Sequence, residues 1–162
     1  MYVPFEEMSE EARVWVYQAN RPFKEEEKTW IISKLVSFCN QWNTHGSPMP
    51  TSFDIKFDQF IVLAVDEGQL GASGCSIDSS IRVLREIETQ LSIKLLDSGK
   101  VSYLSESGVN VAFLPEIKTH IQEGQLQPGS KVFNPSVNKI ADLNNEWLIP
   151  AESSWLKKYF AH

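Results

Sequence analysis

The residues best suited to chemistry lie in one stretch, residues 66–88, which reads DEGQLGASGCSIDSSIRVLREIE. Glycines at positions 68, 71 and 74 precede a cysteine, a group of hydroxyl and carboxylate side chains, and a pattern typical of an amphipathic helix. The free N–H groups of a glycine-rich turn and the positive end of a helix together suit an anion. We therefore predict that residues 68–80 bind a small anion or another small molecule. The candidate ligand-binding residues are Gly74, Ser76, Asp78, Ser79 and Arg82.

The alternative interpretation of this stretch is a crossover loop without a ligand. The glycines then serve only the turns of the backbone. Ser76, Asp78 or Ser79 caps the helix by accepting a hydrogen bond from an N–H group of its first turn. Such loops are common, so the glycines alone do not decide between the two interpretations.

Cys75 is the candidate catalytic residue. A thiol at the start of a helix can have a lowered pKa, which makes it a better nucleophile or redox centre. No histidine lies near it in the sequence, and six residues separate it from Arg82, one more than the phosphatase loop allows. The alternative is a small buried cysteine that packs as an apolar residue. The residues therefore do not decide whether the protein is an enzyme.

Other catalytic and metal-binding patterns are weak or missing. Asp66, Glu67 and Asp78 could meet on a divalent cation, but their spacing fits an acidic strand end and a helix cap better, and we predict no metal site. The chain has no zinc-ligand spacing, no P-loop motif and no G-x-S-x-G motif. The cofactor is therefore unknown from the sequence.

Length and charge limit the class of protein further. The chain of 162 residues is predicted to form one domain, with a core over residues 1–114 and a covering segment over 115–162. Its net charge of −6 argues against nucleic acid as a partner, because phosphate backbones are bound mainly by Lys and Arg. The two cysteines make no disulfide framework, the first residues lack a signal-peptide pattern, and no apolar run could span a membrane. We therefore predict a cytoplasmic protein with no membrane partner.

The elements that must position the predicted site alternate along the chain. The sequence predicts a strand, a helix, two strands, a second helix and a hairpin, in the ranges 12–19, 24–43, 52–58, 60–65, 77–91 and 101–113. The order β-α-β-β-α-β is that of a ferredoxin-like antiparallel sheet, extended here by the second strand of the hairpin. That fold places its first and third strands at the centre, and these are the two runs with large apolar residues on both faces. The predicted fold class is therefore α+β.

The C-terminal part has a weaker pattern, with short helices predicted over 115–122, 140–148 and 153–160. Both long helices should lie on one face of the predicted sheet, so its other face needs a cover. The C-terminal aromatic residues are the first candidate for this cover, and the partner of a homodimer is the alternative. These aromatic residues are Trp147, Trp155, Tyr159 and Phe160.

A resemblance to a known family rests on the segments ARVWVYQANRPF (12–23), FIVLAVDE (60–67), GCSIDSSIRVLREIE (74–88) and WLIPAESSW (147–155). Across nearly the whole chain these segments resemble a small family of uncharacterised bacterial proteins whose members are often labelled ABC transporter ATPases. The label implies ATP hydrolysis, which this sequence does not support, since it has neither a P-loop lysine nor an L-S-G-G-Q-like signature. The family supplies no catalytic residue to carry over.

Two functions remain as expectations. The first is binding of a small anionic ligand at residues 68–80, with Cys75 as the reactive atom if a reaction follows. The second is a non-enzymatic interaction or regulatory role as a homo-oligomer, through an exposed face or edge of the sheet.

Overall fold

The computed structural model describes residues 1–42, 49–66, 75–97 and 99–160, and for 75–78 it describes the backbone. Its helices are α1 (Glu25–Gln41), α2 (Cys75–Leu91), α3 (Ile117–Gln122) and α4 (Ile140–Glu146), with 3-10 turns that include η1 (Phe5–Glu7), η2 (Leu114–Glu116) and η4 (Trp155–Tyr159). Its strands are β1 (Arg13–Gln18), β2 (Thr51–Lys56), β3 (Phe60–Val65), β4 (Lys100–Ser105), β5 (Gly108–Phe113), β6 (Lys131–Phe133) and β7 (Leu148–Pro150). They fall into two compact units, residues 1–96 with 138–140 and residues 97–137 with 141–162.

The first unit is built on a three-stranded antiparallel sheet in the order β1-β3-β2. All six residues of the central strand β3 are buried, as an apolar run without polar alternation requires. β2 joins β3 through a tight turn with Lys56 opposite Phe60, and β1 pairs with β3 so that Trp15 lies opposite Leu63. The two predicted strands 52–58 and 60–65 are thus neighbours, and the central position of β3 is confirmed.

The strand β1 lies at one edge of this sheet rather than at its centre. Its outer side meets residues 138–140: the Val14 N–H group donates to the Asn138 carbonyl group, and the Ile140 N–H group donates to that of Ala12, both at 3.0 Å. These bonds pair some of the backbone N–H and carbonyl groups on the outer edge of β1, where a neighbouring strand would otherwise bind. The expected central position therefore holds for β3 and not for β1.

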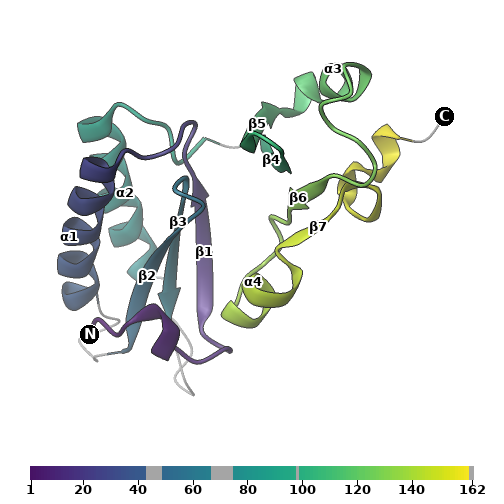
Figure 1. The fold of residues 1–162 in the computed structure, drawn as a ribbon. Coiled ribbons are helices and arrows are strands. Elements are labelled where there is room, and N and C mark those ends of the chain that lie inside the picture. Colours follow the sequence, from purple (N-terminus) through teal and green to yellow (C-terminus); the bar gives the residue numbers. More distant parts are fainter. Residues whose placement is uncertain (43–48, 67–74, 98, 161–162) are drawn as a thin grey trace. The chain divides into compact units, whose positions relative to one another are not determined.

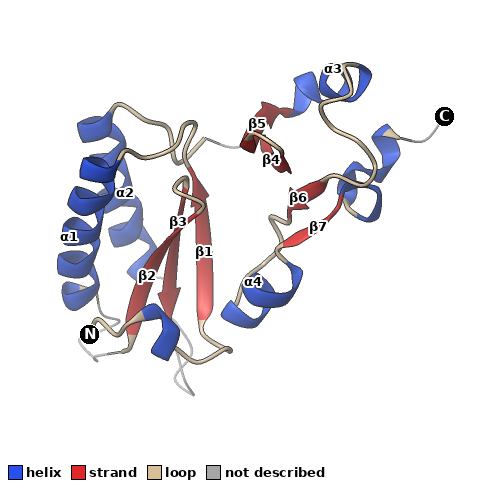
Figure 2. Ribbon diagram, viewed as in Figure 1, coloured by secondary structure: helices blue, strands red, loops and turns tan. Residues whose placement is uncertain are grey.

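Helices α1 and α2 cover the same face of this sheet (Figure 1, Figure 2). Ile31 and Leu35 on α1 and Leu84 and Ile87 on α2 are fully buried, because apolar residues at helical spacing form one stripe that packs on the strands. They belong to one core with Leu63 of β3. Both helices are thus anchored by one face, and their opposite faces remain available to solvent.

The β2–β3 turn differs from the prediction at its tip. Phe57 and Asp58 have φ of 54° and 55°, a left-handed conformation that bulky residues rarely adopt. The strand predicted over 52–58 therefore ends at Lys56, and Phe57 lies outside it. Its side chain is 47% exposed.

The second unit is built on a four-stranded antiparallel sheet in the order β5-β4-β6-β7. Its β4–β5 hairpin was predicted, and the turn ends at Gly108, whose φ of 113° suits glycine. The three-residue strands β6 and β7 were not predicted. The fully enclosed part of its core contains Val101, Tyr103, Ala112, Ile117, Leu126, Val132, Ala151 and Leu156.

The C-terminal aromatic residues divide between the core and the surface. Tyr159 and Phe160 pack against the core of the second unit, and Trp147 is 7% exposed. Trp155, by contrast, is 38% exposed, so the prediction that all four would be packed is wrong for this residue. Its neighbour Leu156 takes the fully buried position instead.

The α+β class is confirmed, and the ferredoxin-like order is followed as far as α2. The next strand, β4, pairs with β5 and β6, whereas a ferredoxin-like sheet would pair it with β1. Pairing with β5 closes only a short loop, which costs little conformational entropy. The compact units accordingly divide between Leu96 and Asp97, before the hairpin.

None of the helices in the described residues is both long and apolar enough to cross a lipid bilayer.

Candidate functional site

The helix of the predicted site begins at Cys75 and continues to Leu91. Cys75, Ser76 and Asp78 therefore lie in its first turn, where backbone N–H groups have no partner within the helix. The rest of the predicted site, Gly74 with the loop from residue 67, lies outside the described residues, as do the side chains of 75–78. Within residues 68–78 of the predicted site, the structure therefore describes only the backbone at the start of the helix.

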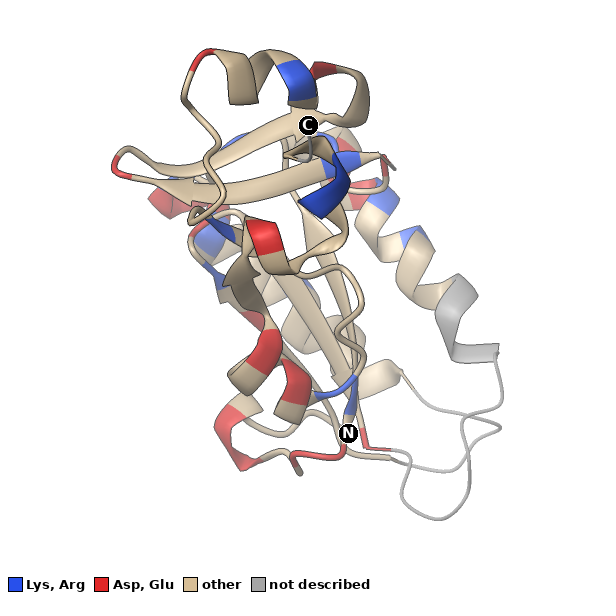
Figure 3. Ribbon diagram, turned by 90° about the vertical axis from the view of Figure 1, so that its right-hand side faces the viewer, with Lys and Arg blue, Asp and Glu red and all other residues tan. Residues whose placement is uncertain are grey.

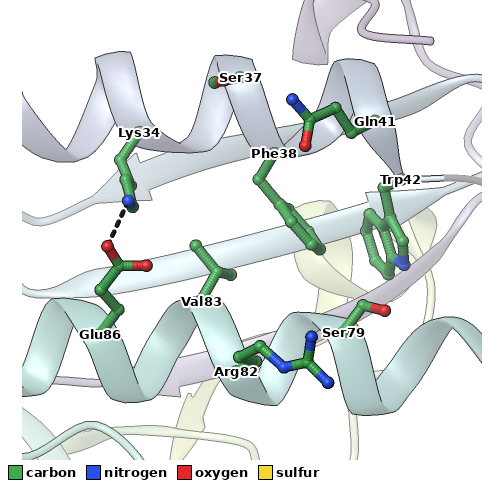
Figure 4. A pocket seen from close by; sticks show the side chains of 9 residues that line it. All are labelled: Lys34, Ser37, Phe38, Gln41, Trp42, Ser79, Arg82, Val83 and Glu86. Carbon is green, nitrogen blue, oxygen red and sulfur yellow. Dashed lines mark hydrogen bonds and ion pairs between the residues drawn. The ribbon is translucent and has the colours of Figure 1, made fainter.

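Ser79 and Arg82, the other two predicted ligand-binding residues, line one groove between α1 and α2 (Figure 4). The groove has a volume of about 360 Å³, which is within the size range of small-molecule pockets. Both side chains are exposed. The remaining lining residues are Lys34, Ser37, Phe38 and Gln41 from α1, Trp42 directly after α1, and Val83 and Glu86 from α2.

Aromatic side chains of α1 form the apolar part of the groove. Phe38 points from α1 toward α2 (Figure 4), and its ring centroid lies 4.9 Å from that of Trp42. Trp42 is 3% exposed and is backed by the Trp15 ring at 6.1 Å. Rings packed in this way hold one another in place. Phe38, which is half-buried, is therefore a fixed apolar surface beside the polar residues of α2.

Two of the three charged residues that line the groove are paired with each other. Lys34 of α1 forms an ion pair with Glu86 of α2 (Figure 4). Arg82 lies one turn before Glu86 on α2, at a spacing that allows the two side chains to form an ion pair. The pair forms with Lys34 instead, and Arg82 has no ion-pair partner within the part of the chain that the structure describes. Its guanidinium group extends along α2 toward Ser79 (Figure 4).

The neighbouring serine has a structural role. Ser80 is 3% exposed, and its hydroxyl group is hydrogen-bonded to that of Tyr17 on β1. Burial raises the pKa of Tyr17 above its ordinary value, and the bond to Ser80 acts in the opposite direction. Ser79 thus faces the groove, whereas Ser80 fixes the second turn of α2 to the sheet.

The other cysteine of the chain is unsuited to thiol chemistry. Cys39 is fully buried on α1, and burial raises the pKa of its thiol to about 12. At neutral pH almost none of it is the reactive thiolate. Cys75 is therefore the only candidate for a reactive cysteine.

Carboxylate, imidazole and thiol groups do not gather in threes anywhere among the described residues in a way that could hold a metal ion. Glu67 and the side chain of Asp78, which the sequence considered together with Asp66, lie outside that description.

The contribution of α1 to the groove was missed by the sequence reasoning. Phe38 and Trp42 were assigned to the core because they continue the apolar stripe of Ile31 and Leu35. Their spacing of four residues does place them on one face, but Phe38 lies at its margin, facing α2. The available signal was the polar pair Ser37 and Gln41, which occurs at the same spacing beside them.

The fold and the groove define an α+β protein of two compact units with a small-molecule-sized groove between its two long helices. No family model matches the chain, and no match is found among curated proteins or solved structures. The resemblance to the uncharacterised bacterial family therefore stays a prediction.

Proposed function

We propose that this protein binds a small anionic molecule along the first half of α2, with the groove between α1 and α2 as part of the site. Arg82 supplies the positive charge and Ser79 a hydrogen-bond donor. The observation that supports this proposal is that both residues, chosen from sequence, line one groove with an aromatic wall.

The electrostatics of the groove favour an anion. The carboxylate group of Glu86 is already paired with Lys34, so it does not neutralise Arg82. A guanidinium group presents several N–H donors in a plane and suits carboxylate and phosphate groups. The half-buried ring of Phe38 favours a ligand with an apolar or aromatic part next to its anionic group.

We further propose that backbone N–H groups of residues 74–80 contribute to the same site, and that Cys75 is the reactive atom if the ligand is a substrate. Its place at the first position of α2 supports this role, because the positive end of a helix stabilises a thiolate. ATP hydrolysis is not proposed, since the chain has no P-loop motif.

The test is a titration of the protein with inorganic phosphate, benzoate and phenyl phosphate, followed by amide chemical shifts. At least one of the three should move the amide signals of 34–42 and 79–86. Arg82→Gln should weaken this binding about tenfold or more, which is the usual effect of removing a charged hydrogen bond.

Arg85→Gln is the matched control. Arg85 is an exposed arginine of the same helix and is not among the lining residues, so its loss should leave the affinity unchanged. Equal weakening in the two variants would reveal a general effect of charge and contradict the proposal. The absence of binding by all three anions would contradict it as well.

A second candidate function is self-association without catalysis. Phe113 and Leu114 are consecutive residues at the end of β5, and each is 42% exposed. Adjacent large apolar side chains in water are typical of interaction surfaces. Sedimentation velocity should therefore show a dimer, and the double variant Phe113→Ser with Leu114→Ser should be a monomer. A wild-type protein that is monomeric at ~100 µM would contradict this function, because even a weak dimer forms at that concentration.

A further inference from the structure

A second pocket of the first unit lies among η1, α1 and β2, and it shares no lining residue with the α1–α2 groove. Its volume is about 430 Å³, again within the range of small-molecule sites. Both aromatic rings and carboxylate groups line it. The lining residues are Tyr2, Pro4, Phe5, Glu6, Glu25, Lys28, Thr29, Ile32, Phe53, Asp54, Ile55 and Asp58.

The rings of this pocket are suited to a cation. Tyr2 and Phe5 are half-buried, and Tyr2 packs on the buried Phe53 with the ring centroids 5.7 Å apart. The face of an aromatic ring carries partial negative charge and attracts an ammonium group. The chain itself uses this property here, because the ammonium group of Lys56 lies 5.4 Å from the centroid of the Phe5 ring.

Carboxylate groups outnumber the ammonium groups around the pocket. Lys28 pairs with Glu25 at 2.7 Å and with Asp58 at 2.9 Å. Of the remaining lining carboxylates, Asp54 pairs with Lys56 at 3.1 Å. Glu6 has no ion-pair partner among the residues that the structure describes.

The carboxylate groups of Glu6 and Asp54 line the same pocket as the Tyr2 ring. The pKa of Tyr2 is raised, first by burial and then by electrostatic interaction with Cys39, Glu6 and Asp54. This direction agrees with the positions of Glu6 and Asp54, which line the same pocket as the Tyr2 ring.

Apolar surface completes the pocket. Ile32 of α1 is 46% exposed and lines it together with the half-buried Ile55. Alkyl groups of a ligand would remove this surface from water. A hydrated metal ion would gain nothing from it, whereas an alkylated cation would.

We propose that this pocket binds a small organic ammonium ion, with its alkyl groups against Tyr2 and Phe5 and its charge between Glu6 and Asp54. The combination of aromatic rings and carboxylate groups is the chemistry that recognises quaternary and alkylated ammonium groups. This site is independent of the anion site, since the two share no residue.

The experiment compares choline with 3,3-dimethylbutan-1-ol, its uncharged isostere, at constant ionic strength. Choline should shift the amide signals of residues 2–6 and 53–58, and the isostere should bind about tenfold more weakly because it loses the cation–π and ionic contacts. Equal shifts from both compounds, or no shift with choline up to ~50 mM, the weakest range of specific binding, would overturn the proposal.

Two variants separate the roles of charge and ring. Glu6→Gln combined with Asp54→Asn should weaken choline binding about tenfold, and Phe5→Leu should weaken it severalfold, because each removes one source of attraction. Asn at 54 keeps an oxygen for the Ile55 N–H group, which now donates to Asp54 at 2.8 Å. Glu10→Gln, in the exposed segment outside the pocket, is the control, and a loss of affinity there equal to that of the double variant would overturn the proposal.

Discussion

Arg21 donates two hydrogen bonds to the carboxylate group of Glu27, each 2.8 Å long. The same carboxylate accepts a bond from the Lys24 N–H group at 2.8 Å, and the guanidinium group also donates to the Leu91 carbonyl group at 2.9 Å. One ion pair therefore ties the start of α1 to the end of α2. It fixes the opposite end of the helix pair from the proposed anion site.

This pair should make the stability of the first unit depend on pH. The hydrogen bonds from Arg21 are the main cause that lowers the pKa of Glu27 from 4.5 to about 2. A lowered pKa in the folded state means that the stabilisation is present above pH 4.5 and is lost as the pH falls toward 2. Glu27→Gln should therefore lose roughly 1–3 kcal/mol of unfolding free energy at pH 7 and progressively less below pH 4.5.

Urea denaturation of wild type and variant between pH 7 and pH 2.5 measures this difference. Glu26→Gln provides the control, because Glu26 is an exposed carboxylate of the same helix turn. A difference between wild type and Glu27→Gln that stays constant with pH would show that the ion pair is not its cause.

The Lys34–Glu86 ion pair should contribute little to stability despite its position across the groove. The two side chains are 32% and 48% exposed, and pairs in water contribute ~0.2–1 kcal/mol, with screening by salt. A double-mutant cycle with Lys34→Met and Glu86→Gln, measured at low and high salt, should give a coupling energy in this range that falls as salt is added. A coupling energy that does not change with salt concentration would contradict the exposure of the two side chains.

Two residues of α1 should respond very differently to truncation. Leu35 is fully buried and Ile32 is 46% exposed. Leu35→Ala should cost ~2–5 kcal/mol of unfolding free energy, because it leaves a cavity in the core, and Ile32→Ala should cost under ~1 kcal/mol. Chemical denaturation measures both, and similar losses would mean that the stripe of α1 is packed differently.

Cys39 and Cys75 should be distinguishable by alkylation. In Cys75→Ser the remaining thiol, Cys39, has a pKa of about 12, so iodoacetamide at pH 8 should leave the folded protein unmodified and label it in guanidinium chloride. In Cys39→Ala, a Cys75 with the proposed reactive thiol should be labelled with a pH midpoint below the ordinary value of ~8.5. A midpoint at or above this value, read by mass spectrometry, would remove Cys75 from the proposed mechanism.

The second unit offers a hydrogen bond that can be deleted without changing volume. The hydroxyl group of Tyr103 lies 2.6 Å from Nδ1 of His120, and Tyr103 is 1% exposed. Tyr103→Phe should cost roughly 1–2 kcal/mol, because it leaves the imidazole nitrogen without this partner. Tyr159→Phe is the control, since Tyr159 is only half-buried, and its thermal midpoint should stay close to that of the wild type.

The sequence alone determined the elements whose pattern is local. The run FIVLAV predicted a buried central strand, and the spacing of Ile31 and Leu35 predicted the inner face of α1, because burial on both faces or on one stripe leaves a direct trace in residue order. The tight β2–β3 turn and the β4–β5 hairpin followed from the same reasoning. The second long helix was also predicted, from the amphipathic repeat after the glycine-rich segment, but its start was placed at residue 77 and the helix begins at Cys75.

Only the tertiary structure decided which distant segments meet. β4 takes β6 as its second neighbour through Tyr103 and Val132, and strands as short as β6 and β7 have no periodicity to detect. The meeting of Phe38 with Arg82 across the groove, and of Tyr2 with Asp54 in the second pocket, likewise depends on chain segments far apart in sequence. A residue pattern specifies which face of an element is apolar, but the partner of that face is chosen by packing over the whole chain, and both proposed sites arise from that choice.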